Sequence, residues 1–181
     1  MSTKKLAHRN FLNGIINTQK VLYGVLFIAL GIAVPQIFHI LGGPAAGTIF
    51  SPMHLPVLIT GLLLGPIAGL YVGSVTPMLS YIIYGMPHVP IMYIMVFELG
   101  IYGLTAGLLY KKYGCRILVS ILGALIAGRL IYAVSFGIIM NTPIFPIIKS
   151  FVLVGLPGLL LQIALIPLLV KMLESAVRGK D

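Results

Sequence analysis

Residues 53–84 read MHLPVLITGLLLGPIAGLYVGSVTPMLSYIIY, an apolar stretch that is too long for a single membrane-spanning helix. A transmembrane helix needs about 20 apolar residues. This stretch also contains the pair Gly65-Pro66, at which a helix is expected to break. Whether residues 53–84 cross a membrane once or twice decides how many helices the chain has and on which side each later loop lies.

The composition of the whole chain indicates a membrane protein. Of its 181 residues, 59% are hydrophobic and only 8% are charged, whereas soluble domains carry about 25% charged residues. Apolar runs of about the length of one membrane span recur along the chain. Besides the stretch above, these runs cover roughly 21–41, 90–110, 117–140 and 147–170. We therefore expect an all-α protein of the polytopic membrane class.

The basic residues decide how many times the chain crosses. They form three clusters, which are Lys4, Lys5, Arg9 and Lys20, then Lys111, Lys112 and Arg116, then Lys171, Arg178 and Lys180. The positive-inside rule places all three clusters in the cytoplasm, so an even number of spans must separate them. Residues 53–84 then have to form two helices, and the chain has six transmembrane helices with both termini cytoplasmic.

The chain is expected to hold one domain. Residues 1–20 are predicted to form a basic amphipathic leader on the cytoplasmic surface, because apolar residues recur there at helical spacing. Residues 21–172 form the six-helix transmembrane domain, and residues 173–181 form a cytoplasmic tail. The net charge of +9 is spread over separate loops, which orientation in a membrane explains better than binding to nucleic acid.

The loops expected on the outer side share one character. GGPAAGTIFSP (42–52), GMPHVP (85–90) and NTPIFP (141–146) are uncharged and rich in glycine and proline. They could be simple turns between helices. Segments of this kind also fold over cavities and carry binding residues. Three such loops on one face favour an outward-facing pocket.

Two ionisable residues lie within the apolar runs. Glu98, in MVFELGIYG (95–103), is the only acidic residue before Glu174, and Arg129 lies in the run 117–140. At 1.5 Å per residue, they lie about 12 Å and about 18 Å below the outer ends of their helices. An extended arginine can cover this difference, so the two side chains can pair if their helices are neighbours. Such residues either fix helix register as an ion pair or hold a polar ligand.

Aromatic and sulfur-containing residues share the helix faces of these two charges. Tyr132 and Phe136 follow Arg129 at helical spacing, and Met95 and Tyr102 flank Glu98 in the same way. Rings beside a carboxylate and a guanidinium suit a flat heterocycle with polar edges. Each ring could equally be part of the core.

Three further polar residues are candidates for the mouth of such a pocket. His54 opens the second apolar run, while His88 and Asn141 lie in two of the uncharged loops. The histidines lack i,i+4 spacing, and the single cysteine, Cys115, provides no cluster, so we expect no metal site and no cofactor. A phosphate-binding G-x-x-x-x-G-K-[ST] loop and paired catalytic carboxylates are also missing from the sequence. The chain is therefore not expected to be an enzyme, and any use of ATP has to come from a partner.

The first helix carries Ala29-Leu-Gly-Ile-Ala33, an AxxxA pattern of small residues. Together with the long stretch 53–87 and FELGIYG (97–103), it resembles the substrate-binding S components of energy-coupling factor (ECF) vitamin transporters. The resemblance implies an S-component-like bundle in a prokaryotic cell membrane, with a vitamin bound near the outer ends of helices 4 to 6. It also implies that Ala29 and Ala33 pack against a membrane T component, which two cytoplasmic ATPases drive.

We therefore predict a high-affinity vitamin-binding subunit of an ECF importer. A carboxylate at Glu98 suits a small hydroxymethylpyrimidine or pyridoxine type of compound, through charge-assisted hydrogen bonds. Pantothenate and folate are alternative substrates, because each carries a carboxylate that Arg129 could bind. The alternative function is a stand-alone proton-coupled secondary transporter in which Glu98 gains and loses a proton.

Overall fold

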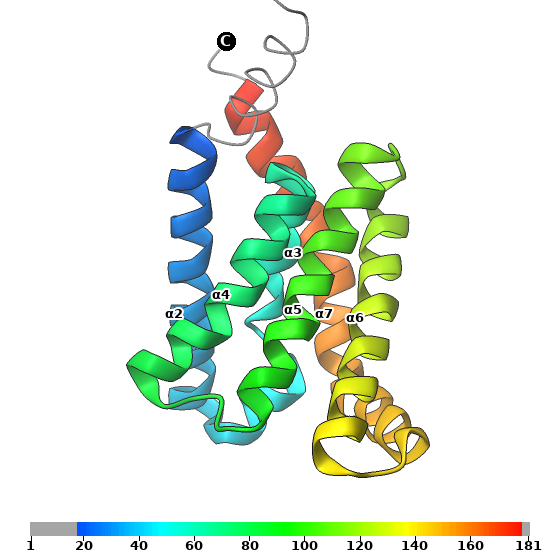
Figure 1. Cartoon of the computed structure of the whole chain (residues 1–181). Coiled ribbons are helices and arrows are strands. Elements are labelled where there is room, and N and C mark those ends of the chain that lie inside the picture. The colour runs from blue at the N-terminus through cyan, green and yellow to red at the C-terminus, as the bar shows by residue number, and fades with distance from the viewer. Residues whose placement is uncertain (1–17, 179–181) are drawn as a thin grey trace, which may run out of the picture.

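The computed structural model describes residues 18–178, apart from the side chains of residues 44–46, 48, 144–153 and 176–178. All regular structure within residues 18–178 is helical, which confirms the all-α class. Figure 1 shows the helices side by side in one bundle. They are α2 (Thr18–Phe50), α3 (His54–Leu64), α4 (Pro66–Tyr84), α5 (Ile91–Gly107), the π-helical turn η1 (Leu108–Lys112), α6 (Ile117–Met140) and α7 (Ile144–Arg178).

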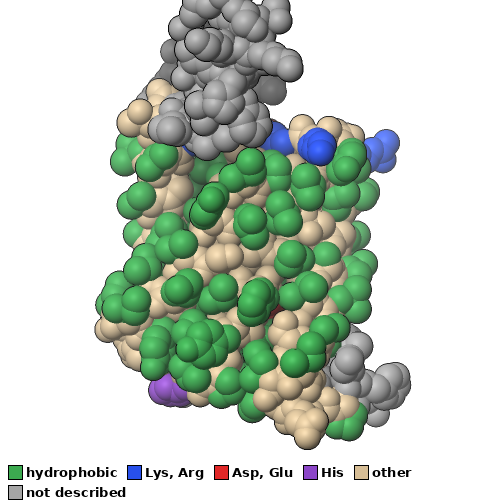
Figure 2. Space-filling model, in the orientation of Figure 1, with side chains coloured by type: hydrophobic (Ala, Val, Ile, Leu, Met, Phe, Trp, Pro, Cys, Tyr) green, Lys and Arg blue, Asp and Glu red, His purple; other side chains and the backbone are tan. Residues whose placement is uncertain are grey.

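Five of the helices contain segments long and apolar enough to cross a membrane. Hydrophobic side chains cover most of the flank of the bundle in Figure 2, as a surface in contact with lipid requires. The sixth helix, α3, has only 11 residues. At 1.5 Å per residue it is about 16 Å long, roughly half the thickness of the hydrocarbon core. The membrane class and the six helices are confirmed, but α3 is shorter than a span.

The break that the sequence predicted within 53–84 is present. Gly65 separates α3 from α4 with φ 102° and ψ 177°, a conformation that favours glycine, and Pro66 begins α4. All residues from His54 to Leu62 are buried. Lipid offers no partners to exposed backbone groups, so a helix that ends inside the bilayer has to be enclosed by protein. Helices α2, α4, α5 and α7 surround α3.

Glycines let α3, α4 and α5 approach one another closely. A Cβ atom on Gly61 or on Gly69 would collide with the backbone carbonyl of Gly103. The reverse also holds, because a Cβ atom on Gly103 would collide with the backbone of Gly69. These glycines therefore serve packing within the bundle, where small residues allow helix backbones to meet in lipid.

The two ends of the described chain lie on the same side of the bundle. The start of α2 and the end of α7 lie at the top of Figure 1, and lysine and arginine side chains gather at the same end in Figure 2. We call this side, which carries Lys111, Lys112 and Arg116, the basic end. Most of the predicted leader and the last residues of the tail lie outside the described residues, so the structure does not test those two boundaries.

The first predicted capping loop, residues 42–52, is helical as far as Phe50 and is not an open loop. Gly43 interrupts α2 with φ 66° and ψ −172°, and the chain then turns back on itself. The ring of Phe50 lies 5.5 Å from that of Phe38, and Gly47 lies against the imidazole of His39. This return directs Ser51 and the start of α3 into the bundle. Residues 85–90 form a non-helical loop that contains a turn, as expected.

Candidate functional site

A cavity of about 400 Å³ lies between α2, the start of α3, α4, α5 and α6. The loop that carries His88 covers part of it, and histidine is visible at the end opposite the basic end in Figure 2. Methionine, proline and isoleucine side chains form the apolar part of its wall. The residues with polar side chains in the wall are Gln36, His39, Ser51, His54, Ser80, His88, Glu98, Arg129 and Tyr132.

Glu98 and Arg129 form an ion pair in this wall. Arg129 Nη1 on α6 donates a hydrogen bond of 3.0 Å to Glu98 Oε1 on α5. Glu98 is only 1% exposed, whereas the Arg129 side chain is 20% exposed. The two side chains therefore pair across neighbouring helices, as their predicted depths allowed. The carboxylate is buried in the wall with a counter-ion beside it.

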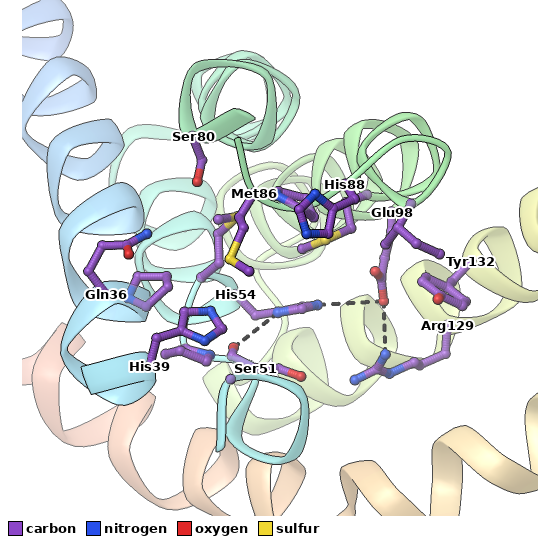
Figure 3. A pocket seen from close by; sticks show the side chains of 17 residues that line it. Gln36, His39, Ser51, His54, Ser80, Met86, His88, Glu98, Arg129 and Tyr132 are labelled. Carbon is purple, nitrogen blue, oxygen red and sulfur yellow. Dashed lines mark hydrogen bonds and ion pairs between the residues drawn. The ribbon is translucent and has the colours of Figure 1, made fainter. Parts of the chain in front are cut away.

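His54 is the third member of this polar group. Its Nε2 atom lies 3.5 Å from Glu98 Oε1, and its Nδ1 atom lies 3.0 Å from the backbone oxygen of Ser51. The return of the chain after Gly43 places His54 here, at the first residue of α3. Figure 3 shows the imidazole between Ser51 and Glu98, with both interactions as dashed lines.

Three predicted residues besides this group also line the cavity. They are Tyr132 on α6, Met95 on α5 and His88 in the loop before α5. The ring of Tyr132 stacks on Phe136, with centroids 5.8 Å apart, but Phe136 itself is not part of the cavity wall. Asn141, exposed at the C-terminal end of α6, is also outside the wall.

Tyr102 supports the site from behind. Its ring is fully buried and meets the imidazole of His54 edge to face, with centroids 4.9 Å apart. The ring also lies against Gly128, where any Cβ atom would collide with it. Tyr102 therefore belongs to the core and contacts a wall residue, without itself lining the cavity.

The sequence did not identify several residues of the wall. Gln36 and His39 lie on α2, Ser80 lies on α4, and all three line the cavity. Gln36 and His39 precede the turn at Gly43, after which the chain brings Gly47 and Ser51 to the same wall, and apolar periodicity does not reveal this return. Ser80 is 1% exposed within a largely apolar helix, and this setting was the only sequence signal for its burial.

The charges of the wall nearly cancel. Glu98 and Arg129 neutralise each other, and the remaining titratable side chains that line the cavity are histidines and Tyr132. Among the described residues, no three His, Cys, Asp or Glu side chains come close enough to hold a metal ion. An apolar cavity with a few convergent polar groups suits a small molecule with a flat ring and polar edges.

The sequence matches a known family along most of its length. The family model described as ECF transporter, substrate-specific component, matches residues 18–177. The match includes every helix from which the cavity is built. No curated protein and no solved structure matches the chain.

Proposed function

Because the chain belongs to the family of substrate-specific components of ECF transporters, we propose that its cavity captures a small water-soluble vitamin or vitamin precursor for import. One observation carries this proposal: a cavity of about 400 Å³ with a buried ion pair in its wall. Small-molecule sites have volumes of about 300–1,000 Å³ and combine apolar walls with a few polar groups.

The polar groups favour a ring with hydrogen-bond donors. Arg129 donates to Glu98, so the carboxylate of pantothenate or folate would have to compete with Glu98 for the guanidinium. Glu98 and His54 instead offer oxygen and nitrogen atoms to ring or amino groups. A compound of the hydroxymethylpyrimidine or pyridoxine type fits this arrangement best.

The energy for transport is proposed to come from partner subunits. Ala29 and Ala33 are both exposed on α2, among exposed apolar residues such as Leu26 and Ile37. Small side chains on an exposed helix face allow another helix to approach closely in the bilayer. We assign this face to a membrane T component driven by two cytoplasmic ATPases, with the basic end in the cytoplasm of a prokaryotic cell.

Purified full-length protein in detergent, without partner subunits, provides the test. A thermal-shift screen against water-soluble vitamins and precursors should give a hit, and calorimetry should show submicromolar binding without ATP. The Glu98→Gln and Arg129→Met variants should each bind the hit at least tenfold more weakly. Normal binding by both variants would refute the site. Protonophore-sensitive uphill uptake by this chain alone in liposomes would instead support a proton-coupled carrier.

A further inference from the structure

His54 carries a buried hydrogen-bond acceptor in the wall of the cavity. Its Nδ1 atom lies 3.0 Å from the backbone oxygen of Ser51, and a carbonyl oxygen can only accept. The hydrogen of a neutral imidazole must therefore be on Nδ1, which leaves a lone pair on Nε2. Nε2 is buried, and it has no hydrogen-bond partner among the described residues.

That lone pair faces a second acceptor. Glu98 Oε1 lies 3.5 Å from His54 Nε2 and already accepts a hydrogen bond from Arg129. A carboxylate and a bare imidazole nitrogen cannot bond to each other, because neither has a hydrogen to donate. Both residues belong to the cavity wall, and Figure 3 shows them side by side. The buried Tyr102 hydroxyl interacts with Glu98 but is not part of the cavity wall. On the cavity side, the pair is therefore complete only when a third group supplies a hydrogen.

A second proton on His54 is the less favourable source of that hydrogen. Glu98 and Arg129 already balance, so an imidazolium would leave the wall with an uncompensated positive charge. The other titratable groups near the pair are Tyr102 and Tyr132 on α5 and α6, and His39 and His88 from α2 and the loop before α5. None of these carries a negative charge at neutral pH. His54 is 3% exposed, and the Glu98 carboxylate beside it is already paired with Arg129, so a second positive charge buried here is costly.

We infer that His54 and Glu98 form an acceptor pair that receives one N–H group of the substrate, such as a ring N–H or an amino group on a heterocycle. The inference rests on the proposed function and narrows its substrate class to heterocycles with an N–H donor. Acceptors 3.5 Å apart can share a single hydrogen in a three-centre bond. Arg129 then serves as the counter-ion of Glu98 and does not receive a substrate carboxylate.

Calorimetry with two pairs of probes tests the inference on the detergent-solubilised full-length protein. The first pair is 4-amino-5-hydroxymethyl-2-methylpyrimidine and its N,N-dimethylamino counterpart. The second is nicotinamide and nicotinate, which share a ring but differ in carrying an amide N–H or a carboxylate. We expect the N–H member of a pair to bind at least about tenfold more tightly, as for a hydrogen bond to a charged group. Tighter binding of nicotinate or of the dimethylamino compound would overturn the inference.

Variants of His54 test whether the acceptor pair causes the preference for probes that carry an N–H group. His54→Phe keeps a ring against Tyr102 but removes the acceptor, so the ratio of affinities within a pair should fall close to one. His54→Gln can offer its amide oxygen and should recover part of the ratio, while thermal unfolding verifies that both variants fold. Tyr110→Phe, which also changes a polar ring but lies outside the cavity wall, is the control, and its ratio should equal that of the unsubstituted protein. An unchanged ratio in folded His54→Phe would overturn the inference.

A screen of vitamins separates this inference from the proposed function. If no water-soluble vitamin or precursor binds, both the proposed function and the inference about the acceptor pair are refuted. If a vitamin without any N–H donor binds in the cavity, only the acceptor pair is overturned. If the vitamin that binds carries such a group, its N-methylated derivative should bind at least about tenfold more weakly.

Discussion

Arg129 on α6 donates a hydrogen bond of 3.0 Å to Glu98 on α5, although 31 positions separate them in the chain. The bond connects the two helices at the wall of the cavity. Because the carboxylate is 1% exposed, the cost of its burial depends on the charge beside it. The pair therefore links the stability of the bundle to the chemistry of the site.

Removal of Arg129 alone should destabilise the protein strongly. Arg129→Met leaves the Glu98 carboxylate without its counter-ion, and breaking a buried pair in this way costs about 3–5 kcal/mol. The double variant Glu98→Gln/Arg129→Met has no buried charge left and should recover most of that loss. Thermal unfolding in detergent measures both. Equal unfolding temperatures for the single and the double variant would show that the pair is not coupled.

The contact between α4 and α5 should be intolerant of a methyl group. In Gly103→Ala, the new Cβ atom would collide with the backbone of Gly69, which cannot move away as a flexible side chain can. Overpacking of this kind costs about 1–3 kcal/mol. Gly24→Ala is the control, because its Cβ atom would meet only Val72 Cγ2 at an ordinary distance of 3.7 Å. Equal thermal stability of the two variants would contradict the close packing.

Features that depend on local backbone preferences or on the depth of a residue within its helix could be predicted from the sequence. Gly65-Pro66 predicted the break between α3 and α4, because proline begins helices and glycine adopts positive φ. The pairing of Glu98 with Arg129 followed from helix depth, since both helices are regular and antiparallel neighbours. Each of these inferences needed only the rise per residue and local backbone preferences.

The return of the chain after Gly43 could not be predicted in the same way. A glycine- and proline-rich segment is equally compatible with an open loop and with a short helix that folds back. Only packing against Phe38 and His39 selects the second conformation. The position of His39 in the wall depends on that packing, so periodicity along α2 gave no signal for it.

Gly128 should be needed for the shape of the site. Gly128→Ala would push a Cβ atom into the ring of Tyr102, and this ring supports His54 edge to face. We expect at least tenfold weaker vitamin binding, measured by calorimetry. Gly123→Ala on the same helix is the control, because its Cβ atom meets only the flexible end of Leu109. Normal binding by Gly128→Ala would show that Tyr102 does not position His54.

The exposed face of α2 should matter for assembly and not for binding. Ala29→Leu and Ala33→Leu place larger side chains on an exposed surface, so thermal stability and vitamin affinity should stay unchanged. Co-purification with a T component and its ATPases should decrease at least several-fold. Ala164→Leu, on an exposed position of α7, is the matched control and should assemble normally. Normal assembly of both α2 variants would place the partner on another face.

The turn at Gly43 should control binding through backbone geometry. Gly43 and Gly114 both have φ 66° and open space around a potential Cβ atom, so alanine at either position costs about 1–3 kcal/mol through strain alone. Only Gly43 directs the return that carries Ser51 and His54 to the cavity. Gly43→Ala should therefore weaken vitamin binding at least tenfold, whereas Gly114→Ala, located at the basic end, should bind normally. Calorimetry and thermal unfolding separate the two effects, and equal affinities would show that the return is not needed for the site.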